Sequence, residues 1–185
     1  MTTTRGKIIL LNGVSSSGKT TLARALTERM PGLFRLSIDR YDDWIAGVED
    51  RDKGRLIPVD TEHYFHRTVA MFSDSGVSVV VDQILHSPSV IQDCVEVLAG
   101  YPVLFVGVHC GLDTLRSRER ERGNRTIGQA EEQLRFVHRQ LECYDLEVDT
   151  SEEPPAFAAE RIARVAETPS SWSGWAAWRE RMLTP

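Results

Sequence analysis

The sequence predicts an α/β fold, with one five-stranded parallel sheet covered by helices on both faces. Short apolar runs rich in β-branched residues alternate along the chain with longer segments whose apolar residues recur at helical spacing. This alternation is typical of parallel strands joined by crossover helices. The composition agrees, because 41% hydrophobic and 26% charged residues in a chain of 185 are ordinary for a globular protein with its own core.

The expected strands are short. Residues 7–12 (KIILLN) and 77–81 (VSVVV) are continuous apolar runs, as strands buried on both faces require. The other three strands are expected at residues 33–38, 103–108 and 146–148. Ligands bind beyond the carboxyl ends of parallel strands, so the polar residues at those ends are the first candidates for a site: Asn12, Asp39, Asp82 and His109.

Helices are expected between these strands. Ser87 followed by Pro88 predicts an N-cap with proline at the first helical position. Residues 39–60 are charged and have few periodic apolar positions, so we expect a long connection that is helical in part. A connection this long is usually functional or disordered. The expected helices are residues 21–30, 61–72, 88–99, 112–122, 129–144 and 155–166.

The chain is expected to form one domain over residues 1–168, followed by a tryptophan-rich tail over residues 169–185. The tail carries Trp172, Trp175 and Trp178 at three-residue spacing. We expect a terminal helix that packs on the domain. The alternative is a contact between subunits of a homo-oligomer, because tryptophan is enriched at interfaces.

Composition also excludes several classes. A net charge of −5 argues against a general nucleic-acid binder. No apolar run reaches the roughly 18 residues of a membrane span, and the first residues lack the apolar region of a signal peptide. The cysteines form no C-x-x-C pair and the five histidines no metal-ligand spacing. These features predict a cytoplasmic protein with no membrane partner.

The most informative motif follows the first strand and fits Gly-x-x-x-x-Gly-Lys-[Ser/Thr], the P-loop that cradles phosphate groups with backbone N–H donors. Lys19 is expected to be solvent-accessible and to reach the β- and γ-phosphates of ATP, and the Thr20 hydroxyl to bind Mg²⁺. A chance Gly/Ser loop is the simpler interpretation, but the strand before it and the helix after it favour the P-loop. The predicted phosphate-binding residues are Gly13, Val14, Ser15, Ser16, Ser17, Gly18, Lys19 and Thr20.

Two carboxylates at strand ends extend this site. Asp82 follows a β-branched run, as in the Walker B pattern, where a carboxylate holds Mg²⁺. Asp39 ends the second expected strand and can serve as general base for an attacking hydroxyl. Both have a plainer interpretation: Asp82 as a capping residue, and Asp39 as an N-cap of the next segment.

An arginine-rich segment, Arg116 to Arg125, follows the fourth strand. Arg116 and Arg120 fit a solvated helix with ion pairs at (i,i+3) and (i,i+4). Gly123 breaks that helix between Arg122 and Arg125, which predicts a lid that brings both guanidinium groups onto a transferring phosphoryl group.

With these residues in place, the chain resembles the chloramphenicol phosphotransferase family of P-loop kinases over roughly residues 6–165. The resemblance rests on ILLNGVSSSGKT, the strand ending at Asp39, VVVDQ, RERERGNR and YDLEVDTS. It implies transfer of the γ-phosphate of ATP to a substrate hydroxyl, antibiotic resistance as the role, Asp39 as general base, and Arg122 and Arg125 in the lid. Two departures concern the acceptor: Gln83 follows Asp82 where the family tends to have a second acid, and residues 41–60 match poorly.

Two other functions stay open. A nucleotide or nucleotide-sugar kinase, including toxin kinases that phosphorylate UDP-sugars, needs basic residues near its acceptor, and Arg40, Arg51, Lys53 and Arg55 could serve. A regulatory NTPase needs no acceptor; the Asn-Lys-x-Asp motif of guanine-reading switches is absent from the sequence.

Overall fold

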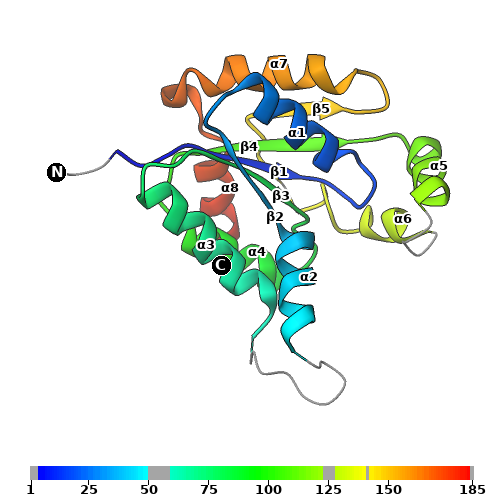
Figure 1. Cartoon of the computed structure of the whole chain (residues 1–185), viewed down its shortest axis with the longest axis horizontal. Helices are drawn as coiled ribbons and strands as arrows, with labels where there is room; N and C mark the ends of the chain where they lie inside the picture. The colour runs from blue at the N-terminus through cyan, green and yellow to red at the C-terminus, as the bar shows by residue number, and fades with distance from the viewer. Residues whose placement is uncertain (1–3, 50–58, 123–127, 141, 184–185) are drawn as a thin grey trace.

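The computed structural model describes residues 4–49, 59–122, 128–140 and 142–183. Its sheet has five parallel strands in the order β2-β3-β1-β4-β5 (Figure 1). The P-loop follows the central strand β1, which has β3 on one side and β4 on the other. The predicted parallel sheet is therefore confirmed. Its strands are β1 (Ile8–Asn12), β2 (Phe34–Ser37), β3 (Val79–Gln83), β4 (Val103–His109) and β5 (Leu146–Asp149).

Helices cover both faces of the sheet (Figure 1). Helices α1 and α7 pack on one face, and α3, α4 and α8 on the other, while α5 and α6 lie beyond the carboxyl ends of the strands (Figure 1). Within the described ranges, no helix combines the length and apolar character that crossing a membrane requires. The helices are α1 (Lys19–Arg29), α2 (Ile38–Val48), α3 (Thr61–Asp74), α4 (Pro88–Val97), α5 (Leu112–Arg122), α6 (Gln129–Gln133), α7 (Pro155–Ala166) and α8 (Gly174–Leu183), with a 3₁₀ turn at Pro169–Ser171.

Strand alternation divides the interior into two cores. In β3, Val79 and Val81 face α3 and α4, whereas Val80 faces α1 and α7. The same period of two carries on to the strand end, so Asp82 and Gln83 leave β3 on opposite faces of the sheet. This places two polar side chains of adjacent residues in different surroundings.

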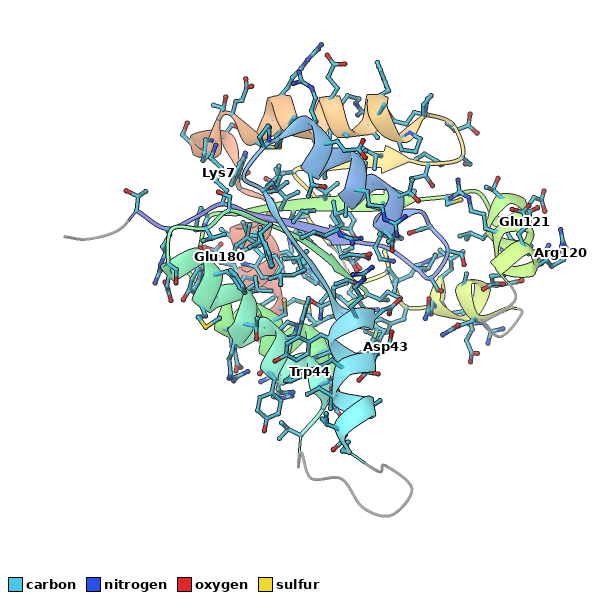
Figure 2. All side chains as sticks on the ribbon, viewed as in Figure 1. Lys7, Asp43, Trp44, Arg120, Glu121 and Glu180 are labelled. Atoms are coloured by element: carbon cyan, nitrogen blue, oxygen red, sulfur yellow. The ribbon has the colours of Figure 1, made fainter. Side chains whose placement is uncertain are left out.

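The second strand ends earlier than expected, and the helix α2 takes up the first part of the expected long connection. β2 stops at Ser37, the N-cap of α2, so Asp39 lies in the first turn of that helix rather than at a strand end. Ile38 and Tyr41 pack against the core on the α3 face. These two contacts hold α2 against the core. Trp44, on the outward face of the helix, is exposed (Figure 2).

The helix expected at residues 129–144 is wrong beyond its first turn. α6 ends at Gln133, and turns follow up to Arg139. His138 adopts the left-handed backbone conformation, with φ of 67°, which a helix does not tolerate. The two carboxylate oxygens of Glu142 accept hydrogen bonds from the backbone N–H groups of His138 and Gln140. The Glu142 carboxylate therefore satisfies backbone N–H groups that would otherwise donate to backbone carbonyls within a helix.

The C-terminal tail forms α8, which closes the face of the sheet opposite α1. Trp178 is fully buried and stacks on Phe105 of β4 at 4.9 Å between ring centroids, and Trp175 meets the same ring edge-on. Both indole N–H groups donate to backbone carbonyls, of Leu98 and Gln140. The tail is thus part of the core cluster on this face.

Candidate active site

The P-loop lies between β1 and α1 in a conformation that depends on its glycines. Gly18, the N-cap of α1, has φ of 90°. A Cβ on Gly13 would lie 2.4 Å from the carbonyl oxygen of Val108, so the loop can approach β4 only without a side chain there. Glycine therefore occupies the positions where a side chain would prevent the backbone N–H groups from closing around an anion.

Lys19 is buried, with 6% of its surface exposed, so the expectation of an accessible lysine is wrong. Its Nζ donates hydrogen bonds of 2.8 Å to the carbonyl oxygens of Gly13 and Val14. Backbone carbonyls of its own loop thus hold the ammonium group. The N–H of Ser15 donates in turn to Oε1 of Gln133, which ties the loop to α6.

Thr20 and Asp82, the two residues that the sequence predicts for a metal site, are in direct contact. The Thr20 hydroxyl donates to Oδ2 of Asp82 at 2.6 Å, and Asp82 is 6% exposed. Among the described residues, no group of three or more His, Cys, Asp or Glu side chains is placed to hold a metal ion alone. A hydroxyl and one carboxylate fit Mg²⁺, which typically completes its octahedral shell with phosphate oxygens and water.

Two further hydroxyls in the loop suit a phosphate ligand. The Oγ atoms of Ser16 and Ser17 are buried and make no hydrogen bond within the described part of the chain. Buried polar atoms rarely stay unpaired in native proteins. Together with the glycine-dependent backbone, these orphaned donors fit a bound nucleotide phosphate.

Asp39 and residues of the P-loop line the same cavity, which has a volume of about 450 Å³. The carboxylate is exposed, and the helix N-terminus favours a negative charge in this first turn. Because Ser37 is the N-cap of α2, the capping interpretation of Asp39 does not hold. The cavity is lined by Ser15, Ser16, Gly18, Lys19, Thr20, Thr21, Arg24, Ile38, Asp39, Asp82, Gln83, Ile84, Arg118, Glu121, Thr150 and Pro155.

Sequence reasoning missed the role of Arg118. Its Nη1 donates to Oγ1 of Thr150 at 2.9 Å and to the carbonyl oxygen of Ser16 at 3.3 Å, and its Nη2 donates to the carbonyl oxygen of Thr150 at 2.9 Å. Thr150 also donates to the carbonyl oxygen of Ser17 at 2.6 Å. Both residues therefore brace the P-loop. The available signal was their place in the two most selective segments of the resemblance, RERERGNR and YDLEVDTS.

Arg116 and Arg120 of α5 are exposed. Arg116 pairs with Glu131 at 2.8 Å on the surface, and Arg120 points away from the sheet (Figure 2). The predicted lid residue Arg125 lies outside the described residues, and only the backbone of Arg122 is described. Buried Glu119 accepts hydrogen bonds from the N–H groups of Gly128 and Ala130, which links α5 to the start of α6.

A polar cluster begins at Asn12, the residue before the P-loop. The Tyr144 hydroxyl meets Nδ2 of Asn12 at 2.8 Å and Nδ1 of His138 at 2.7 Å. The His138 ring lies against the ring of His109, tilted by 32° with 4.1 Å between centroids. Burial, then the neighbouring charges of His109 and Lys19, lower the pKa of His138 to about 4. The imidazole is therefore neutral at pH 7 and adds no charge beside the lysine.

Comparison with known proteins agrees with this geometry. Residues 6–167 match the family described as chloramphenicol phosphotransferase-like protein. Relatives from two strains of Mycobacterium tuberculosis, CDC 1551 and H37Rv, are named provisionally as O-phosphotransferases. Each is 31% identical over 176 residues, covering 80% of this chain and 77% of the relative.

Solved structures share the fold at low identity. The APS kinase of M. tuberculosis has a TM-score of 0.68 at 16% identity and covers 88% of this chain and 98% of its own. The tunicamycin resistance protein of Deinococcus radiodurans gives 0.66 at 18%, covering 88% and 96%, and a sugar kinase of Janibacter gives 0.64 at 20%, covering 91% and 99%. These likenesses establish a P-loop kinase fold. The chain belongs to the chloramphenicol phosphotransferase-like family and is a phosphotransferase of the kinase type.

Proposed function

We propose that this protein transfers the γ-phosphate of ATP to a hydroxyl group of a small molecule. One observation carries the proposal: Lys19, Thr20, Asp82 and Asp39 all line a single cavity. Phosphoryl transfer to a hydroxyl needs a phosphate-binding loop and a carboxylate that share one cavity. Within this proposal the enzyme works in the cytoplasm.

Each residue has a defined task. The P-loop N–H groups and Lys19 bind the β- and γ-phosphates, while Thr20 and Asp82 would hold Mg²⁺. When bound, the metal ion neutralises charge that develops on the phosphate oxygens. Arg118 braces the loop through Ser16 and Thr150. In the same proposal, Arg122 and Arg125 complete the charge stabilisation from the lid.

The transfer step starts at Asp39. Its carboxylate takes the proton of the acceptor hydroxyl, and the acceptor oxygen forms a bond to the γ-phosphorus. The bond between that phosphorus and the oxygen bridging to the β-phosphate breaks, and ADP leaves with the bonding electron pair. The carboxylic acid on Asp39 then returns its proton to solvent. General-base catalysis of this kind contributes roughly 10²–10⁴-fold.

Two classes of acceptor are considered. The family description favours a neutral antibiotic such as chloramphenicol. A phosphate-bearing acceptor, as in a nucleotide or nucleotide-sugar kinase, is favoured by three neighbouring arginines, of which Arg24 lines the cavity. Burial lowers the pKa of Arg35, and the nearby charges of Arg40 and Arg24 lower it further. Nη1 of Arg35 is buried without a hydrogen-bond partner among the described residues.

An acceptor panel separates these classes. Purified protein is incubated with ATP and Mg²⁺ and with either chloramphenicol or UDP-N-acetylglucosamine, and ADP and the phosphorylated product are detected by mass. We expect a phosphoryl mass shift on the neutral compound. A shift on the UDP-sugar alone would reassign the acceptor class. ATP binding without transfer to any hydroxyl, together with a complex that forms in only one nucleotide state, would favour a regulatory NTPase.

A further inference from the structure

A buried chain of three polar side chains runs from α4 through α3 to the cavity. Oδ2 of Asp93 lies 2.6 Å from Nδ1 of His66, and Nε2 of His66 lies 2.7 Å from Nε2 of Gln83. His66 is fully buried, Gln83 is 1% exposed and Asp93 8%. The mechanism above uses none of these three residues.

The charges around His66 fix its proton. Burial lowers the pKa of His66 even though Asp93, Glu62 and Gln83 act to raise it, so the ring is neutral at pH 7. Burial acts to raise the pKa of Asp93, but hydrogen bonds from His66 and Arg67 outweigh it, and the pKa is lowered. The ionised carboxylate only accepts hydrogen bonds, so the proton of His66 sits on Nδ1.

This tautomer determines which way the Gln83 amide points. Nε2 of neutral His66 offers a lone pair, and only the NH₂ group of Gln83 can donate to it. The amide oxygen, on the other branch of the same carbon, is therefore turned away from His66. The histidine thus sets the hydrogen-bonding character of a glutamine that lines the cavity.

The amide oxygen is left without a partner. Oε1 of Gln83 is buried and makes no hydrogen bond within the described part of the chain. This oxygen lies on the other side of the sheet from Thr20 and Asp82, the predicted metal ligands. Strand alternation turns Asp82 toward α1 and Gln83 toward α3 and α4. Ile38, next to Asp39, packs against the core on this same face. The orphaned oxygen therefore belongs to the acceptor side of the cavity.

We propose that Gln83 is a specificity residue whose Oε1 accepts a hydrogen bond from a hydroxyl or N–H group of the acceptor molecule. His66 and Asp93 are positioning residues, which hold the amide in the orientation that presents its oxygen. The site then discriminates against molecules that place only a hydrogen-bond acceptor at this point, because Oε1 would stay unpaired. This inference rests on the proposed phosphotransferase function.

The first test needs no substrate. Long-range ¹H–¹⁵N NMR spectra of the histidines at pH 7 report the tautomer of His66, assigned with a His66→Gln variant. We expect the Nδ1–H form. An Nε2–H form or an imidazolium ring would donate to Gln83 and turn Oε1 toward His66, and either result would overturn the proposal.

The second test uses chloramphenicol as the acceptor. Gln83→Met keeps the length of the side chain but removes the amide, and we expect the KM for chloramphenicol to rise roughly 10- to 100-fold. The kcat and the KM for ATP should stay within about twofold, a split that a general packing defect does not produce. Gln92→Met, on the exposed face of α4, is the matched control and should change neither constant.

A second variant covers the case in which Gln83→Met does not fold. Asp93→Asn frees His66 to change tautomer, and it should raise the same KM without affecting ATP. An unchanged KM for chloramphenicol in a folded variant of either residue would overturn the specificity role. If the parent protein transfers no phosphate to chloramphenicol, the acceptor assignment above fails, and the same KM comparison is made with the panel compound that does take the phosphate.

Discussion

Protonation of His138 should make the protein less stable in mild acid. Its pKa is about 4 in the folded chain, against an ordinary value of 6.5, because burial and the charges of His109 and Lys19 disfavour the imidazolium. The unfolded chain binds the proton first, so stability falls as pH drops below 6.5 and the loss is complete below about 4. Between pH 7.5 and 5.0 this residue should cost about 2 kcal/mol, at 1.36 kcal/mol per pKa unit.

The assay compares urea unfolding of the parent and His138→Asn at both pH values. Asparagine tolerates the left-handed backbone at this position, so the variant can keep the turn. Its free energy of unfolding should fall by about 2 kcal/mol less than that of the parent on acidification. Equal falls in parent and variant would refute the assignment of a buried neutral imidazole.

His86 provides a control of opposite sign. Its hydrogen bond to Glu62 raises the pKa of His86, so its stabilisation is present below pH 6.5 and is lost as pH rises through the folded value. His86→Asn should therefore lose stability more steeply than the parent on acidification, whereas His138→Asn should lose it less steeply.

Three further outcomes are expected. Trp178→Ala should lower the free energy of unfolding by about 3–5 kcal/mol in urea titrations, because the fully buried ring leaves a cavity against Phe105. Lys19→Ala should abolish transfer but leave the circular dichroism spectrum unchanged, and retained turnover would contradict the P-loop assignment. Arg118→Ala should weaken ATP binding about tenfold by calorimetry, because it loses charged hydrogen bonds to the loop; the outward-facing Arg120→Ala should bind ATP as the parent does (Figure 2).

Local signals were enough to predict the sheet and the nucleotide-binding loop. The β-branched runs before Asp82 and the glycine pattern before Lys19 are contiguous in sequence, so periodicity and spacing record them directly. The closeness of Thr20 and Asp82 could also be predicted. The P-loop follows one strand and Asp82 ends another, and the carboxyl ends of parallel strands lie at the same edge of a sheet.

The features that sequence reasoning missed depend on residues distant in the chain. The turn at His138 is held by Glu142 and by packing on His109, which outweigh the helical periodicity of residues 129–144. The burial of Lys19 depends on how its own loop folds back on it. Gln83, His66 and Asp93 come from a strand and two helices and have no shared spacing.

The most direct test of the account is single-turnover phosphoryl transfer by Asp39→Asn, with ATP affinity measured in parallel. The substitution keeps the size and polarity of the side chain but removes the base, so transfer should fall by roughly 10²-fold or more while ATP affinity changes little. Asp82→Asn is the contrast: it should weaken Mg²⁺-dependent ATP binding as well as transfer, because it alters the partner of Thr20. Transfer by Asp39→Asn at the parental rate would contradict the account, since the acceptor hydroxyl would then be activated by another group.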